Sequence, residues 1–377
     1  MLQIPEFKKE LYICAKCGYC RESCPTRRLI GFDRICPRGL IVSMKHFLEK
    51  QKPISKELTE NWYFCTTCGR CKEVCPADID LPELIRSIRI DMIQKGLQMP
   101  AYFTTAVNGI LDDGNPIGKV KEEKTDLLSG SLITPKKSKY LYFAGCMASY
   151  WLPETANAIS EILKLASFDF GTLGLDESCC GLVPAWSGDM ESTKQVVKKI
   201  MKSIEESGAS TVFTSCPGCY TTFKNDYPKI SGNPGFEVLH VLEVFKELIN
   251  RGDLTFRKKI DSTVTYHDPC HIGRFHGMFE TPREIIQAIP GVRLVEMEYN
   301  RKEANCCGGP LRTGGWIDQA LTIGKWRIEE AKEVGADLLV TCCPQCVINL
   351  RQAALGSIEV IDFPILLARA LNLKLDY

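Results

Sequence analysis

The stretch CAKCGYCRESCP, residues 14–25, returns 51 residues later as CTTCGRCKEVCP, residues 65–76. Both copies have the spacing C-x2-C-x2-C-x3-C, and a proline follows the last cysteine of each. The paired positions are Cys14 and Cys65, Cys17 and Cys68, Cys20 and Cys71, and Cys24 and Cys75. Self-similarity at a fixed period shows how a chain divides into units, so it is considered first. The N-terminal part of this chain is therefore a duplicated cysteine motif.

A second duplication of a different kind occupies the rest of the chain. Its first copy contains Cys146, Cys179, Cys180, Cys216 and Cys219, and its second copy contains Cys270, Cys306, Cys307, Cys343 and Cys346. The offset is 124 residues for the first cysteine of each copy and 127 for the other four. Of the 20 cysteines, only Cys36 and Cys342 lie outside both patterns, since Ser87 and Ser215 stand at the corresponding positions. We expect neither of these two to be a ligand.

Composition restricts the classes of protein to which the chain can belong. A formal net charge of +1 over 377 residues excludes a strongly basic nucleic-acid binder. No apolar run approaches the roughly 18–20 residues of a membrane span, and the first eleven residues lack the apolar centre of a signal peptide. Grouped cysteines in a reducing compartment indicate metal or redox chemistry. We therefore expect a cytoplasmic protein, or one held at the membrane through a partner.

The N-terminal spacing is the bacterial ferredoxin pattern for [4Fe–4S] clusters, in which the fourth cysteine of each run serves the other cluster. This predicts one cubane cluster on Cys14, Cys17, Cys20 and Cys75 and another on Cys65, Cys68, Cys71 and Cys24. Structural zinc is the alternative. Zinc is typically held by two separated C-x2-C hooks, so four cysteines within eleven residues favour the clusters.

The remainder of the chain alternates apolar strands with helical periodicity, which predicts α/β units with parallel sheets. Strands are expected at 140–144, 211–214, 237–240, 263–266, 293–296, 338–341 and 359–361. Helices are expected at 39–51, 81–95, 152–166, 190–206, 241–250, 282–289, 317–334 and 364–371. Most of the second set of cysteines follows strand ends, where open α/β sheets place their sites.

These patterns predict an α/β protein with an N-terminal, mainly α-helical part. Residues 1–112 form a two-cluster ferredoxin-like domain, and 113–139 form a linker by their Gly, Pro, Ser and Lys content. Two pseudo-symmetric α/β domains follow at 140–256 and 257–377. Each offers five thiols, one more than a cubane cluster or a zinc ion takes. This predicts an open or irregular cluster in each domain. A zinc site with a spare cysteine and a redox-active dithiol remain alternatives.

At these residues the chain resembles the CCG-type, cysteine-rich iron–sulfur oxidoreductases. The resemblance rests on Cys146, Cys179-Cys180-Gly181 and Cys216-Pro217-Gly218-Cys219, and on Cys270, Cys306-Cys307-Gly308 and Cys343-Pro344-Gln345-Cys346. A ferredoxin region before two such domains is similar to the D-type chain of heterodisulfide reductase. The resemblance implies two noncubane [4Fe–4S] clusters on the ten cysteines, which would carry catalysis by reducing a disulfide.

The resemblance also implies partners and an alternative function. Electrons would come from a flavoprotein subunit, a membrane cytochrome b subunit or both, and the substrate would be a small-molecule disulfide or thiol. The alternative is a non-catalytic iron–sulfur subunit of an FAD-linked glycolate, lactate or glycerol-3-phosphate dehydrogenase that delivers electrons to a quinone or other acceptor. The segment ICPRGLI, residues 35–41, favours these flavin-linked relatives. No flavin or nicotinamide fingerprint occurs, so we expect neither cofactor in this chain.

Three histidines surround Cys270 in the segment HDPCHIGRFH, residues 267–276. One of His267, His271 and His276 could give a proton to a leaving thiolate, because histidine titrates near neutral pH. We favour the alternative for each of them, a structural hydrogen bond to a sulfur or a carbonyl group.

Overall fold

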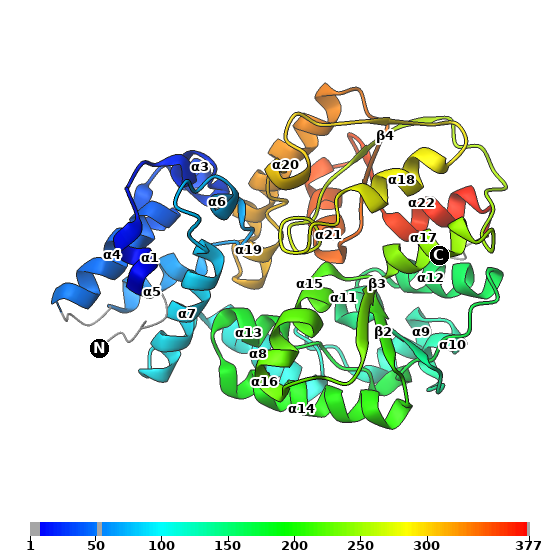
Figure 1. The fold of residues 1–377 in the computed structure, drawn as a ribbon, viewed down its shortest axis with the longest axis horizontal. Coiled ribbons are helices and arrows are strands. Elements are labelled where there is room, and N and C mark those ends of the chain that lie inside the picture. Colours follow the sequence, from blue (N-terminus) through cyan, green and yellow to red (C-terminus); the bar gives the residue numbers. More distant parts are fainter. Residues whose placement is uncertain (1–7, 51–54, 375–377) are drawn as a thin grey trace.

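The structure is a computed structural model that describes residues 8–50 and 55–374, and it has three parts (Figure 1). An all-helical N-terminal part lies at one end of the molecule, beside two α/β halves that are stacked on each other. The first half contains a three-stranded sheet and the second half a four-stranded sheet. The chain is thus a mixed α/β protein with a helical N-terminal region, and the predicted fold class is confirmed.

The N-terminal part is built from short helices around the cysteine loops, with a few longer ones. Its helices are α1(Lys8–Ile13), α2(Tyr19–Glu22), α3(Pro25–Ile30), η2(Asp33–Ile35), α4(Pro37–Lys50), α5(Lys56–Tyr63), α6(Arg70–Glu73), α7(Leu81–Gln94) and α8(Ala101–Asp113). The predicted helices 39–51 and 81–95 correspond to α4 and α7, and residue 51 lies outside the described residues. The Asp80 carboxylate accepts the Glu83 backbone N–H at 3.1 Å and so caps α7. Leu40, Met44, Leu84 and Ile88 belong to this part's core.

The stretch 113–139, whose composition suggests a linker, carries short helices that pack on the first half. These are η3(Lys121–Glu123), α9(Lys124–Leu127) and α10(Gly130–Ile133). Leu128 and Leu132 enter the core of the first half, and Lys136 pairs with Thr172 across an antiparallel bridge. A few apolar residues in a polar stretch are enough to hold it against the domain, because their burial removes apolar surface from water.

The first half has three parallel strands in the order β1-β2-β3. The strands are β1(Tyr140–Phe143), β2(Thr211–Thr214) and β3(Glu237–His240). The helices are α11(Gly145–Tyr150), α12(Pro153–Leu165), η4(Gly174–Asp176), α13(Leu182–Ser187), α14(Met190–Ser207), α15(Pro217–Thr221), the π-helical turn η5(Thr222–Asp226), α16(Tyr227–Ser231) and α17(Val241–Asn250). Strands β2 and β3 and helix α17 occupy the residues that the sequence predicts.

The second half repeats this plan and adds an edge strand, giving the parallel order β5-β4-β6-β7. Its strands are β4(Ser262–Tyr266), β5(Val292–Val295), β6(Leu338–Thr341) and β7(Glu359–Asp362). Its helices are α18(Glu280–Ala288), η6(Arg301–Glu303), α19(Pro310–Thr313), α20(Ile317–Glu333), α21(Pro344–Ala354) and α22(Phe363–Ala370). In the first half a single parallel bridge, between Leu141 and Gly171, lies where β5 would pair.

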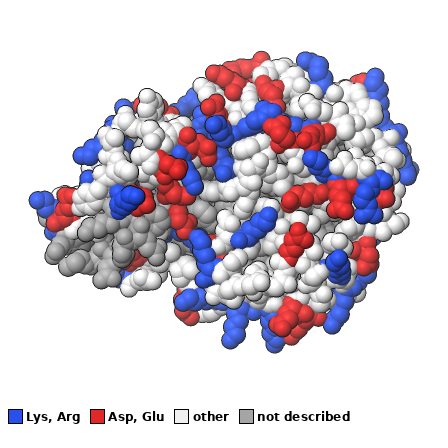
Figure 2. All heavy atoms as spheres, in the orientation of Figure 1, with Lys and Arg blue, Asp and Glu red and all other residues white. Residues whose placement is uncertain are grey.

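The three parts are joined by buried contacts rather than by loops alone. Between the halves, Leu152 packs with Val347 and Ile348. Between the N-terminal part and the first half, Arg86 of α7 reaches Asp226 of η5 at 2.6 Å, and both side chains are buried. Figure 2 shows basic and acidic side chains interspersed over one face, without a continuous patch of either sign.

Candidate functional site

The first predicted ligand set comes together across the two N-terminal motifs. Cys14, Cys17, Cys20 and Cys75 all line one small cavity. The first three belong to the loop before α2 and to α2 itself, whereas Cys75 follows α6, 51 residues beyond its counterpart Cys24. Among the twenty cysteines, Cys17 is the exposed one.

The second predicted set is also gathered, and it is more deeply buried. Burial, together with the neighbouring thiols of Cys65 and Cys68, raises the pKa of Cys24 to about 12. Burial likewise holds the pKa of Cys71 well above its usual value, with contributions from Cys65, Cys68 and Cys24. The structure therefore brings Cys24 to the three cysteines of the other motif.

The backbone of both motifs has left-handed residues at equivalent positions. Lys16 and Thr67, at equivalent positions, have φ angles of 57° and 52°, and Gly18 and Gly69 have φ angles of 93° and 78°. Left-handed residues in such short loops make concavities of N–H groups that suit anions, including Fe–S sites. In one of them the Thr67 N–H donates to the Cys65 sulfur at 3.3 Å. Four thiols and an amide-lined loop fit an anionic iron–sulfur cluster in each set.

The five cysteines of the first half lie in mutual contact. Cys179, Cys180 and Cys219 belong to one buried cluster against which Cys146 and Cys216 pack, and the thiols interact in the pairs Cys179 with Cys146, Cys180 with Cys179, and Cys219 with Cys180 and Cys216. These contacts, with burial, hold the pKa values of Cys179, Cys180 and Cys219 well above the usual value. The pKa of Cys216 is lowered instead, chiefly by its interaction with the neighbouring Cys219 thiol.

The five cysteines of the second half are arranged in a similar way. The Cys346 thiol donates to the Cys307 sulfur at 3.1 Å, and Cys306 also donates to Cys307, so the pKa of Cys307 lies well below its usual value. The backbone N–H groups of Gly308 and Gly309 point at the sulfurs of Cys306 and Cys307, at 3.3 and 3.4 Å. Cys270 and Cys343 interact with the same group.

Thiols this close cannot all ionise in a metal-free chain, since each thiolate raises the pKa of its neighbours. Cations can compensate several thiolates at once, and metal binding then releases the protons. The donor set of each half is five thiols, and in the second half backbone amides also point at the sulfurs. This set fits a cluster with thiolate ligands, and iron is the metal that such sulfur-rich sites hold in clusters.

One contact connects the N-terminal part to the second half. Cys68 and Cys306 pack in the same buried cluster, and their interaction, together with burial, holds the pKa of Cys68 well above its usual value. Both side chains are buried. The second ferredoxin set and the second CCG set therefore meet at their cysteines, although they lie more than 230 residues apart in the chain.

The two cysteines outside the patterns have different surroundings. Cys342 lies beside the Tyr266 hydroxyl at 3.0 Å. In the first half, Ser215 and Tyr142 form the same pair at 3.3 Å. Cys36 is buried at the start of α4.

The histidines around Cys270 are held by specific neighbours. Arg327 Nε donates to His267 Nδ1 at 3.1 Å, and His267 has a ring nitrogen within 4.8 Å of the Cys307 and Cys346 sulfurs. Burial lowers the pKa values of His267 and His271 to about 3, and Arg327 contributes to the shift at His267. His276 contacts the Thr221 hydroxyl at 3.1 Å, and burial lowers its pKa to about 4. All three are neutral at pH 7, which favours the structural interpretation.

Several supporting residues escape the sequence patterns. Arg89 donates to the carbonyl oxygens of Trp62, Cys65 and Trp186 and so fixes the second motif. Glu177 accepts the N–H groups of Ala144 and Gly145, which immediately precede Cys146. Burial raises the pKa of Glu177 to about 7. Only the position of Glu177, two residues before a cysteine pair, could have suggested it.

The Cys307 carbonyl is held by Asn349 Nδ2 at 2.7 Å, and the Cys180 carbonyl by the Tyr227 hydroxyl at 3.1 Å. Both donors come from the helical segment that follows the C-P-x-C motif of the same half. The cysteine pair and the later motif of each half are thus tied together through the backbone.

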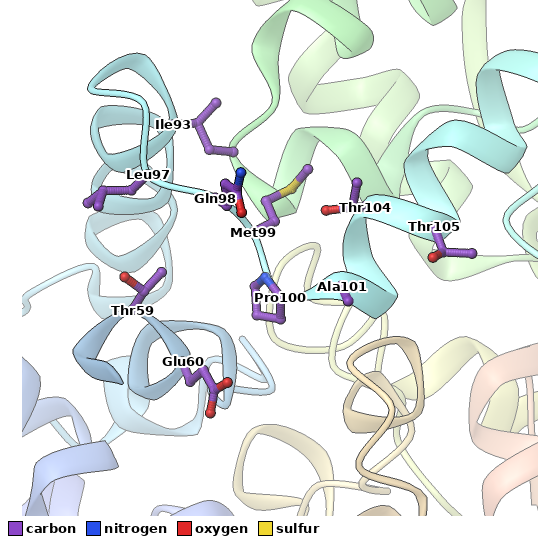
Figure 3. A pocket seen from close by; sticks show the side chains of 10 residues that line it. All are labelled: Thr59, Glu60, Ile93, Leu97, Gln98, Met99, Pro100, Ala101, Thr104 and Thr105. Carbon is purple, nitrogen blue, oxygen red and sulfur yellow. The ribbon is translucent and has the colours of Figure 1, made fainter. Parts of the chain in front are cut away.

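Two further cavities differ in their relation to the cysteine sets. One, of about 730 Å³, lies between α5, the end of α7 and the start of α8 (Figure 3). Its lining includes Leu97, Met99 and Thr104 and contains no cysteine. The other, of about 330 Å³, lies between the N-terminal part and the second half, with Cys24 and Cys306 in its lining.

Comparisons with known proteins agree with this organisation. A family described as "Cysteine-rich domain" matches residues 140–224 and again 264–351, and one described as "4Fe-4S dicluster domain" matches residues 10–79. The chain is 32% identical to the D chain of the dihydromethanophenazine:CoB–CoM heterodisulfide reductase of Methanosarcina acetivorans, over 97% of this chain and 95% of that protein.

More distant relatives carry other names. The chain is 29% identical to the B chain of the fumarate reductase (CoM/CoB) of Methanothermobacter marburgensis, over 94% of this chain and 71% of that protein. It is 26% identical to "EtfAB:quinone oxidoreductase" of Syntrophomonas wolfei, over 90% of this chain and 54% of that protein.

A crystal structure of a hypothetical protein from Helicobacter pylori matches 98% of this chain and 75% of its own, with a TM-score of 0.61 and 11% identity, which shows a shared fold alone. None of the helices in the described residues has the length and apolarity of a membrane span.

Proposed function

Because the chain belongs to the family of the D chains of heterodisulfide reductase, we propose that it reduces a small-molecule disulfide within a larger oxidoreductase complex. It is an iron–sulfur oxidoreductase subunit with CCG domains and a ferredoxin-type region. The observation that carries the proposal is that both five-cysteine sets are complete in the sequence and each is gathered in the fold. Splitting a disulfide produces two sulfur atoms, and each of the two five-cysteine sets would bind one of them.

The proposed ligands follow the four groups of cysteines. Two cubane sites would use Cys14, Cys17, Cys20 and Cys75, and Cys65, Cys68, Cys71 and Cys24. Two noncubane sites would use Cys146, Cys179, Cys180, Cys216 and Cys219, and Cys270, Cys306, Cys307, Cys343 and Cys346. Clusters on these thiols would supply one-electron transfer at potentials set by charge and hydrogen bonding.

The solvent exposure of the cysteines supports a direction for electron transfer through the chain. Cys17 is exposed, so the first N-terminal set is within reach of a partner protein, whereas Cys68 and Cys71 are buried. Cys68 in turn contacts Cys306 of the second half. We infer that electrons enter from a reduced flavoprotein or cytochrome partner at the first set and continue through the second set to the CCG halves.

The overall reaction balances with that partner as reductant. Two electrons and two protons are taken up, the S–S bond of the substrate breaks, and two thiols leave. The protein holds its sulfurs in place with backbone donors such as those of Gly308 and Gly309 and keeps most of them away from water. The two protons are taken up from solvent.

Anaerobic purification with iron analysis and EPR tests the proposal. We expect about 16 irons per chain, four clusters of four. We also expect an EPR signal that changes when thiol is added, and oxidation of a reduced dye that depends on a disulfide. Cys179→Ser and Cys306→Ser should abolish the thiol response, whereas Cys36→Ser should keep it. About 8 irons with bound zinc, or no response to thiols and disulfides, would overturn the proposal.

The similarity to a quinone oxidoreductase supports a second candidate, an electron carrier between a flavoprotein and a quinone. In that case the chain would copurify with a flavoprotein and reduce a quinone analogue, and disulfides would have no effect on its EPR spectrum. The same preparation therefore separates the two functions.

A further inference from the structure

The two halves differ in the charged groups that surround their cysteines. At the offset of 124 residues that relates Cys146 to Cys270, Tyr150 of the first half corresponds to Arg274 of the second. In the first half, Lys124 lies near Cys146, but the carboxylate of Glu177 interacts with its charge. The second half therefore carries a guanidinium where the first has a phenol ring.

Arg274 ties three backbone segments together. Its Nε donates to the Cys68 carbonyl at 2.7 Å, and its Nη1 donates to the carbonyls of Ala304 and Lys302 at 2.7 and 3.2 Å. The next residue, Phe275, packs over Gly69, where a Cβ atom would lie 3.5 Å from the ring. Arg274 thus fastens the second ferredoxin motif to the loop that precedes Cys306.

The charge of Arg274 differs from those of the neighbouring arginines in its hydrogen-bond acceptors. Arg283 forms ion pairs with Asp268 and Glu296, and Arg327 pairs with Glu330. Within the described part of the chain, no ion pair includes Arg274, whose acceptors are carbonyl groups. Its charge interacts with Glu73 and acts on three proposed ligands, Cys68 first and then Cys270 and Cys306. These belong to the two sets that meet at the Cys68–Cys306 contact.

We propose that Arg274 is a positioning residue that makes the second half the place where electrons leave the ferredoxin region. The inference rests on the proposed iron–sulfur function. The clamp keeps Cys68 against Cys306, which shortens the path from the second ferredoxin set to the second half. The positive charge of Arg274 favours an added electron in the second half over the first half, which has Tyr150 at the corresponding position. The step moves one electron and breaks no bond: the ferredoxin side is oxidised, the second half is reduced, and the partner protein restores the electron.

The test uses the full iron-loaded chain and its potentials. Arg274→Gln removes the charge, Arg274→Lys keeps the charge without the three-carbonyl clamp, and Arg293→Gln is the control. Arg293 is an exposed arginine of the same half whose side chain hydrogen-bonds to the Thr263 hydroxyl and has no cysteine partner within the described residues. The EPR signal of the second half is identified by its loss in Cys306→Ser and is then followed in a potentiometric titration.

We expect Arg274→Gln to lower the reduction potential of the second-half signal by about 59 mV. For one electron this shift equals a tenfold change in the reduction equilibrium constant. Arg274→Lys should stay near the wild-type potential but transfer the electron more slowly after rapid mixing with reductant. An unchanged potential in Arg274→Gln with a full iron content, or an equal shift in Arg293→Gln, would overturn the inference. If Arg274→Gln loses iron, wild-type transfer rates in Arg274→Lys would also overturn it.

The outcome is separable from that of the proposed function. A shifted potential in a chain whose EPR spectrum ignores thiols and disulfides would retain the role of Arg274 and reject disulfide reduction. An EPR spectrum that responds to thiols, with an unshifted potential in Arg274→Gln, would retain disulfide reduction and reject the role of Arg274.

Discussion

Two adjacent cysteines that follow β6 differ in what their side chains meet. Cys342 pairs with the Tyr266 hydroxyl, and the first half makes the same contact with serine, between Ser215 and Tyr142. Burial keeps the pKa of Cys342 well above its usual value, so the thiol stays protonated. Cys343 begins the C-P-x-C motif at the N-terminus of α21 and interacts with Cys346.

Cys342→Ser should therefore keep the full iron content and change the free energy of unfolding by about 1 kcal/mol or less, since one hydrogen bond replaces another. Cys343→Ser should lose the iron of the second half, about four atoms. Iron analysis and thermal unfolding of the two variants compare them directly. Iron loss in Cys342→Ser would show that this cysteine is a ligand after all.

Helices α7 and α13 approach each other at a glycine. Gly188 ends α13 with a φ of 93°, and a Cβ atom there would lie 2.4 Å from the Arg89 carbonyl carbon. Gly208 ends α14 with a φ of 74°, and a Cβ atom there would meet nothing within 4 Å. Both positions need a left-handed residue, but only Gly188 also needs the space.

Gly208→Ala should cost about 1–2 kcal/mol, the strain of a left-handed alanine. Gly188→Ala should cost a further 1–3 kcal/mol or so, because the helices must move apart. Denaturant unfolding of the iron-loaded variants gives both values. Equal losses would mean that α7 and α13 separate without cost.

At the scale of the whole molecule, a buried ion pair joins the ferredoxin region to the first half. Arg86 and Asp226 lie 2.6 Å apart with side chains 6% and 1% exposed, and Arg86 also donates to the Ala185 carbonyl. Burial raises the pKa of Asp226 above its usual value in spite of Arg86, which shows how costly an unpaired charge would be here.

Asp226→Ala should destabilise the chain by about 3–5 kcal/mol, because it removes the buried partner of the Arg86 guanidinium and leaves the partly exposed Glu83, at 3.7 Å, as its acidic neighbour. Replacing both partners, as Arg86→Met with Asp226→Leu, should recover much of that loss. Denaturant unfolding of the single and double variants measures the coupling. A double variant no more stable than Asp226→Ala would show that the ion pair does not hold the two parts together.

Local patterns were enough for much of the fold. Strands β2, β3 and β6 lie at the predicted residues, and α7 begins at Leu81, the first residue of the predicted helix 81–95. Apolar period, capping residues and motif spacing are properties of neighbouring residues, so they can be read directly. The stretch 113–139 shows the limit, because its polar composition hides the few leucines that bind it to the first half.

Three features follow from the amino-acid sequence alone: the two duplications, the division of the cysteines into four sets and two others, and the α/β plan. The tertiary structure alone decided that Cys68 meets Cys306, and that Arg89 and Arg274 hold the second motif in place. Cys68 and its two contacts Arg274 and Cys306 are more than 200 positions apart, and such a separation leaves no periodic signal of a contact. Their meeting depends on how three separately patterned parts pack, and that packing is fixed by buried surfaces and charges that only the folded chain brings together.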